Sequence, residues 1–107
     1  MASSKSYLAF ILEQLSPLSG ITYRAMMGEY ILYYHGKIVG GIYDDRLLVK
    51  SIAASNALIP NPILELPYKG GKKMILVKDV DSRALLAQLF EAMYDELPSP
   101  KPKKTKI

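Results

Sequence analysis

The segment from residue 21 to residue 52 limits the possible folds more than any other part of the chain. It is rich in β-branched and aromatic residues, and two short turn signals interrupt it, His35-Gly36 and Asp44-Asp45. Bulky runs joined by loops of two residues are typical of antiparallel β-hairpins. The segment therefore predicts a meander of three or four antiparallel strands.

The first hairpin has a register that follows from its loop. If His35 and Gly36 form that loop, the expected partners are Tyr34 with Lys37, Tyr33 with Ile38, Leu32 with Val39, Ile31 with Gly40 and Tyr30 with Gly41. A glycine opposite a bulky residue leaves room for an aromatic ring to lie across the neighbouring strand. We therefore expect the glycine pair to make space for Tyr30.

Helical periodicity flanks this meander on both sides. A first apolar stripe consists of Tyr7, Leu8, Ile11, Leu12 and Leu15, with Ser3 or Ser4 as the expected N-cap. A last stripe consists of Leu85, Leu86, Leu89, Phe90, Met93 and Leu97, with Asp79 or Asp81 as the expected cap. Each stripe recurs at helical spacing, so we expect a helix at each end of the domain.

Between the meander and the last helix the sequence predicts a short helix over 53–58 and a hairpin of strands 64–68 and 73–77. Pro67 cannot donate to a ladder, which favours an edge position for its strand. The order of elements is typical of a two-layer α+β sandwich with a mainly antiparallel sheet. We expect one domain over 1–97 and a flexible tail rich in proline and lysine over 98–107.

Composition excludes several classes of protein. The chain has 107 residues, enough for one core, and no cysteine, which excludes disulfides and thiolate metal sites. No signal peptide or membrane-spanning run is visible, so we expect a cytoplasmic protein. The net charge of +4 comes from the four tail lysines, Lys101, Lys103, Lys104 and Lys106. These could contact phosphates weakly and without sequence preference, or serve only solubility.

The polar residues give no convincing catalytic or metal site. His35 is the single histidine and falls in a predicted loop, where a solvated turn residue is expected. Asp44 and Asp45, even with Glu29, are better explained as turn formers than as cation ligands. The pairs Gly40-Gly41 and Gly70-Gly71 lack the context of a phosphate-binding loop. We therefore expect neither catalytic residues nor a cofactor.

Aromatic residues on the predicted strands are the most informative candidates for binding. They are Tyr23, Tyr30, Tyr33, Tyr34, Tyr43 and Tyr68, and the cations Arg24, Lys37 and Lys50 lie near them in sequence. Tyrosine and arginine concentrate binding energy in protein interfaces, but aromatic sheets with cations also bind nucleic acid. Glu29 and Asp45 are candidate ion-pair partners of Arg24. The expected partner-binding set is Arg24, Tyr30, Tyr33, Tyr34, Lys37 and Lys50.

Two stretches resemble a known family. Residues 23–37, YRAMMGEYILYYHGK, and residues 43–50, YDDRLLVK, are similar to the N-terminal domain of the TfoX (Sxy) competence regulators. The resemblance covers about residues 5–97. It implies a two-layer α+β fold in a bacterial cytoplasmic protein. Full-length members look like co-activators that help a cyclic-AMP receptor protein, and they carry a C-terminal helical domain. We expect this chain to be a stand-alone copy without that domain.

The resemblance and the residues together predict a non-enzymatic regulatory or protein-interaction domain. Its expected partner is a protein of the transcription machinery, a regulator of the cyclic-AMP receptor type, or a second copy of the chain. A nucleic-acid-binding module is the first alternative, and it requires Arg24, Lys37 and Lys50 on one face with open tyrosines. A small-molecule-binding domain or enzyme is the second, and it requires a cleft with convergent polar groups.

Overall fold

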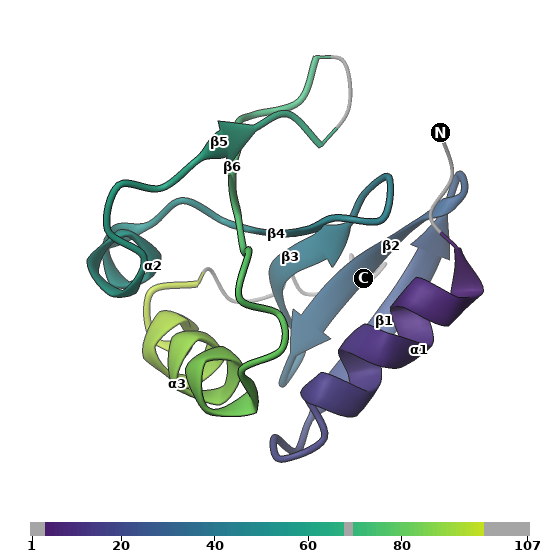
Figure 1. The fold of residues 1–107 in the computed structure, drawn as a ribbon, viewed down its shortest axis with the longest axis horizontal. Helices are drawn as coiled ribbons and strands as arrows, with labels where there is room; N and C mark the ends of the chain where they lie inside the picture. The colour runs from purple at the N-terminus through teal and green to yellow at the C-terminus, as the bar shows by residue number, and fades with distance from the viewer. Residues whose placement is uncertain (1–3, 68–69, 98–107) are drawn as a thin grey trace, which may run out of the picture.

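The computed structural model describes residues 4–67 and 70–97. The elements in chain order are α1 (Lys5–Gln14), β1 (Ile21–Met26), β2 (Glu29–Tyr34), β3 (Lys37–Ile42), β4 (Leu47–Val49), α2 (Ala53–Leu58), β5 (Leu64–Glu65), β6 (Met74–Leu76) and α3 (Arg83–Tyr94). All strand pairs are antiparallel, and the sheet order is β1-β2-β3-β4-β6-β5 (Figure 1). The α+β class, the meander and the second hairpin are confirmed, and Pro67 follows the edge strand β5.

The three turns of the meander are built alike. Each places two successive residues at positive φ: Met27 and Gly28, His35 and Gly36, and Asp44 and Asp45. This backbone conformation suits two-residue hairpins, because its twist matches that of the flanking strands. The third turn uses two aspartates and no glycine. The Asp45 carboxylate accepts hydrogen bonds from the backbone N–H and the hydroxyl of Ser4, which links the turn to the start of α1.

The register of the β2–β3 hairpin differs from the sequence prediction beyond its first two pairs. Tyr34 pairs with Lys37 and Tyr33 with Ile38, as predicted, but a β-bulge then shifts the register by one residue. The observed pairs are Leu32 with Gly40, Ile31 with Gly41 and Tyr30 with Ile42. The shift allows both Val39 and Ile42 to enter the core, where neither is exposed. Burial of Ile42 is the physical reason for the bulge.

The glycine pair also makes room for a different ring than expected. A Cβ on Gly41 would lie 2.6 Å from the ring of Tyr43, so Tyr43 and not Tyr30 lies across the glycine. Leu48 pairs with Gly41 and is fully buried, yet neither Tyr43 nor Leu48 belongs to the main core cluster. The two residues therefore form a small second cluster on the sheet face away from that core.

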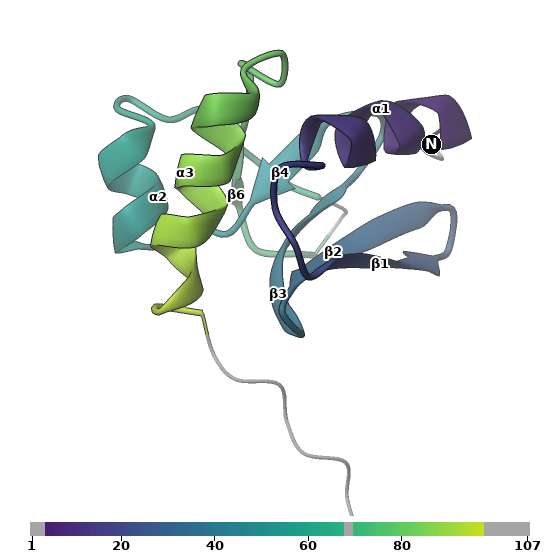
Figure 2. The same cartoon turned by 90° about the horizontal axis from the view of Figure 1, so that it is seen from below.

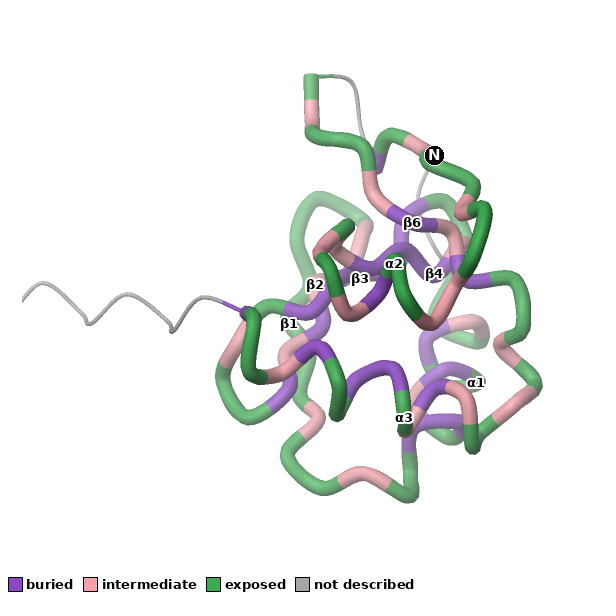
Figure 3. The backbone as a smooth tube through the Cα atoms, turned by 90° about the vertical axis from the view of Figure 1, so that its left-hand side faces the viewer, coloured by how far each residue is buried: buried purple, intermediate pink, exposed green. Residues whose placement is uncertain are grey.

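The main core lies between the sheet and the helices. Figure 2 shows α1 lying over β1 and β2, while α3 packs beside α2. Both predicted helix stripes contribute, and among the described residues the largest fully buried side chain is Phe90 of α3. Buried and exposed segments alternate along the backbone (Figure 3). None of the helices in the described residues has the length and apolarity needed to cross a membrane.

The helix caps match the prediction at one end of the domain only. The Ser4 hydroxyl accepts the N–H of Tyr7, so the expected cap of α1 is confirmed. The cap of α3 is Ser82, which accepts the N–H of Leu85, and the expected Asp79 or Asp81 was wrong. A turn in which the Ser82 N–H bonds the Asp79 carbonyl precedes the helix and sets its start after both aspartates.

Candidate protein interface

Strand β1 is an edge of the sheet and is exposed along nearly its whole length. Ile21 is half-buried and the next five residues are exposed. Three apolar side chains stand out: Tyr23 and Met26 on the strand, and Met27 in the turn, which is 95% exposed. An uncovered edge strand presents unpaired backbone groups that can pair with another chain.

The hydrogen-bonding pattern of the β1–β2 hairpin identifies which backbone groups of β1 are unpaired. In a two-residue hairpin the residues next to the loop form a hydrogen-bonded pair, here Met26 and Glu29, and such pairs recur at every second residue. The bond from the His35 N–H to the Gly20 carbonyl, 2.8 Å, continues the same alternation. The N–H and C=O groups of Tyr23 and Ala25 therefore point away from β2, toward the open edge.

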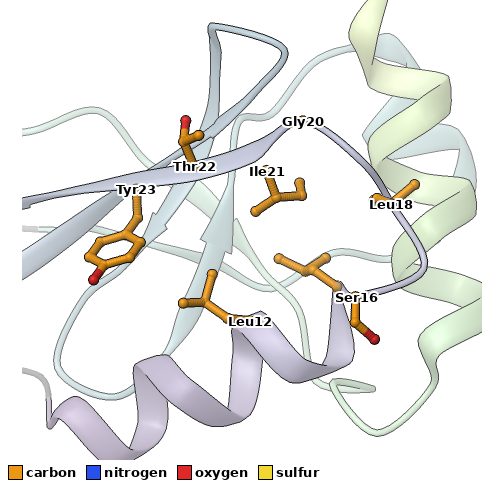
Figure 4. Close-up of a pocket in the computed structure, with 8 residues that line it drawn as sticks. Leu12, Ser16, Leu18, Gly20, Ile21, Thr22 and Tyr23 are labelled. Carbon is orange, nitrogen blue, oxygen red and sulfur yellow. The ribbon is translucent and has the colours of Figure 1, made fainter.

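Two apolar pockets lie beside this edge, between α1 and β1. The first has a volume of about 550 Å³ and is lined by residues that include Leu12, Leu15, Leu18 and Ile21 (Figure 4). The second has a volume of about 440 Å³ and is lined by Leu8, Ala9 and Ala25 among others. Tyr23 lines both pockets. The open edge and a row of apolar pockets thus run side by side.

The opposite edge of the sheet is different. Strand β5 has only two residues, and Pro67 follows it closely. The Arg46 guanidinium forms an ion pair with Glu65 and also bonds the carbonyl of Leu66 at 3.4 Å. A short strand with a nearby proline is a poor template for pairing. Of the two edges, β1 is the one suited to strand addition.

The predicted partner-binding residues divide between the two faces of the sheet. Arg24 and Tyr33 lie on the face away from α1. Arg24 pairs with Ile31 and Tyr33 pairs with Thr22, and the side chains of directly paired residues point to the same face. Arg24 is exposed and makes no ion pair with any residue in 4–67 or 70–97, the candidates Glu29 and Asp45 included. Lys50 lines a separate pocket on this face. These three residues are accessible from one side.

The other three predicted residues face the helices. Tyr30 and Tyr34 belong to the core cluster, so the prediction of exposed tyrosines does not hold for them. The Lys37 ammonium bonds the carbonyl of Tyr94 at 3.0 Å and lies 4.0 Å from the centre of its ring. The structure therefore does not bring Arg24, Lys37 and Lys50 to one face. The four tail lysines and Tyr68 lie outside the described residues.

Burial of Tyr34 has a consequence at high pH. Desolvation, reinforced by the negative charge of Glu91 and by Tyr94, raises the pKa of Tyr34 above its ordinary value of 10.0. The unfolded chain therefore releases this proton at a lower pH than the folded chain does. The contribution of Tyr34 to the free energy of unfolding is complete below pH 10 and is lost as pH rises through the folded-state pKa. We expect urea unfolding to show stability falling above about pH 10. The decline should be smaller in Tyr34→Phe, and an equal decline in both proteins would contradict this assignment.

The acidic residues of the third turn have structural roles. The Glu29 carboxylate accepts the N–H of Asp44 at 3.1 Å, and Asp45 bonds Ser4. His35 is exposed, with its ring packed against Tyr34 and Tyr94. Within the described residues no group of three histidine, aspartate or glutamate side chains is placed to hold a metal ion.

The two pockets beside β1 were not predicted from the sequence. The pockets depend on how α1 packs on the strand, which no local pattern specifies. The available signal was Met26-Met27, two large apolar residues at a predicted turn, where polar residues are the rule. Met27 is the most exposed of the large apolar residues in the described chain.

An α+β domain with an open edge strand is the class that the geometry defines. Residues 13–94 match the TfoX N-terminal domain, and the chain belongs to that family. It is similar to an uncharacterized 12.7 kDa protein in the trpE 5′ region of Spirochaeta aurantia, with 37% identity over 107 residues. That similarity covers 99% of this chain and 93% of the relative. No solved structure matches the chain.

Proposed function

We propose that this domain is a non-enzymatic protein-interaction module that binds an extended segment of a partner along β1. The observation that carries the proposal is the open edge of β1 next to two apolar pockets. Strand addition of this kind obtains affinity from main-chain hydrogen bonds and specificity from pockets for alternate side chains. Both components are present on the same side of the domain.

The geometry defines the kind of segment that fits. Its backbone pairs with the N–H and C=O groups of Tyr23 and Ala25, which point to the open edge. Alternate side chains of an added strand point to one face, two residues apart. The pockets that share Tyr23 would receive two such side chains, and their lining favours apolar ones. The ligand is therefore an extended segment with apolar residues at alternate positions.

The family supports a partner in transcription. TfoX regulators act through protein contacts at promoters, so RNA polymerase and a regulator of the cyclic-AMP receptor type are the partners we propose. Arg24 projects from the same strand to the opposite face and would make a second contact. Its exposed guanidinium, with Met26 beside it, fits the composition of an interface centre.

The test uses a proline that alters only the outward edge. Ala25→Pro removes an N–H that points away from β2, so the ladder with β2 stays intact, whereas a partner strand loses a bond and meets the ring. Ala25→Ser is the matched control, since it keeps the N–H and adds little volume to the pocket that Ala25 lines. By surface plasmon resonance on purified RNA polymerase and the receptor-type regulator, we expect Ala25→Pro to weaken binding at least tenfold, about 1.4 kcal/mol.

The two parts of the proposal fail separately. Binding that Ala25→Pro leaves unchanged contradicts the edge as the docking site. Binding to neither protein contradicts the assignment to transcription. Arg24→Ala tests the second contact, and full affinity in that variant contradicts it.

A further inference from the structure

A third pocket lies on the sheet face away from α1, and its charge distinguishes it from the two beside β1. Its volume is about 580 Å³, within the range of small-molecule sites. The side chains that matter are the cations Lys50, Lys72 and Lys73 and the apolar residues Ile38, Tyr43 and Met74. They come from β3, β4 and β6 and from the segments that follow or precede those strands.

The three lysines have no compensating charge in the pocket. Among residues 4–67 and 70–97, no aspartate or glutamate lines it, and the ion pairs use Arg46 and Arg83. Lys50 is half-buried, which strengthens its field, while Lys72 and Lys73 are exposed. Like charges gathered around one concavity repel one another and raise the local concentration of anions. The pocket therefore has the electrostatics of an anion site.

The apolar part of the lining gives the ligand a second property. Tyr43 is held by close packing on Gly41, so its ring is a fixed part of the wall. Ile38 is 39% exposed and Met74 is half-buried, and both line the pocket. Inorganic phosphate alone would leave these surfaces in water. A ligand that carries both an anionic group and an apolar or ring portion uses the whole site.

The wall of the pocket is anchored and does not depend on the lysines. Arg46 donates to the Tyr43 carbonyl at 3.0 Å and pairs with Glu65, which lies two residues before Pro67. Pro67 is buried and lines the pocket. Charge changes at the lysines should therefore leave the concavity in place.

We infer that this pocket binds a small organic phosphate, with the phosphate on Lys50, Lys72 and Lys73 and the organic portion against Ile38, Tyr43 and Met74. The inference is independent of strand addition at β1, because the two sites share no lining residue. A ligand of mononucleotide size suits the volume.

The experiment is an NMR titration of the full ¹⁵N-labelled chain with adenosine 5′-monophosphate, with adenosine and inorganic phosphate as partial ligands. We expect saturable shifts at Ile38, Tyr43 and Lys50 with Kd below ~1 mM, and at least tenfold weaker binding of each partial ligand. Lys50→Glu with Lys73→Glu should weaken binding at least tenfold. Lys78→Glu is the control, since this exposed lysine lines a different pocket.

Several results would overturn the inference. One is the absence of shifts at ~10 mM nucleotide, since a site this weak has no use at cellular concentrations. Another is shifts confined to the tail lysines, and a third is equal loss in the Lys78→Glu control. Binding of a single-stranded oligonucleotide without binding of the mononucleotide would assign the surface to nucleic acid instead. Should the double variant not fold, Lys72→Glu alone decides, because that side chain is exposed.

Discussion

Gly40→Ala is expected to destabilise the protein by about 3 kcal/mol, a large part of the stability of a domain of this size. A Cβ at this position would collide with the carbonyl oxygen of Leu48 and lie 2.8 Å from the Cα of Val49. Both atoms belong to the backbone of the paired strand β4, which cannot move without breaking the ladder. The strand and the bulge beside it must therefore distort together.

Gly70→Ala is the control for this substitution. It adds the same methyl group where no atom lies within 4 Å, although φ there is +87°. The strained backbone alone should cost about 1–2 kcal/mol. Urea unfolding of the two variants measures the difference. Equal stability of Gly40→Ala and the wild type would show that β3 and β4 are not packed as closely as the structure has them.

Phe90→Ala is expected to cost about 4 kcal/mol. Phe90 is fully buried in α3, and its ring centre lies 6.3 Å from that of Tyr34 in the sheet. Removing the ring leaves a cavity between the helix layer and the sheet, in addition to the lost transfer free energy. The change should appear in the unfolding midpoint without a change in its slope.

Phe10→Ala provides a matched control, because the chain has two phenylalanines in different environments. Phe10 lies on α1 with 36% of its surface exposed and packs only loosely on Tyr7, with ring centres 6.1 Å apart. We expect a cost below about 1 kcal/mol. If the two variants lose the same stability, the placement of α3 over the sheet is wrong.

The elements of this fold could be predicted because their signals are local. Two-residue turn signals at His35-Gly36 and Asp44-Asp45 placed β2, β3 and β4, and helical spacing placed α1 and α3. The bulge could not be predicted in this way. The choice between Gly41 and Ile42 as the partner of Tyr30 depends on which residue the core accepts, and that is decided by the helices that cover the sheet.

The candidate site was predictable only in part, for a related reason. Arg24 was expected on a strand, with Glu29 and Asp45 as candidate ion-pair partners. It lies exposed on the edge strand β1, and within the described residues it pairs with neither. Lys37 was assigned to the same surface, but a ring 57 residues further along the chain holds its ammonium on the other face. The groove between α1 and β1 likewise arises from contacts distant in sequence. Local patterns identify strands, whereas surfaces depend on packing.

The placement of the two candidate sites suggests a division of roles. The edge of β1 and its pockets lie beside α1, while the lysine pocket lies across the sheet among residues of β3, β4 and β6. Strand β2 pairs with both β1 and β3, so it lies between the strand of the first site and the strands of the second. Among the described residues, the lysine pocket shares no lining residue with the two pockets beside β1, so each site can be altered without the other.

Amide hydrogen exchange at β1, followed by NMR in the free chain and with a bound extended peptide selected from a random library, decides whether β1 is the docking edge. In the free chain we expect Arg24 to be protected and Tyr23 and Ala25 to exchange fast, and we expect the bound peptide to protect Tyr23 and Ala25 in turn. If these two amides are already protected in the free chain, or stay unprotected when the peptide is bound, β1 is not the docking edge.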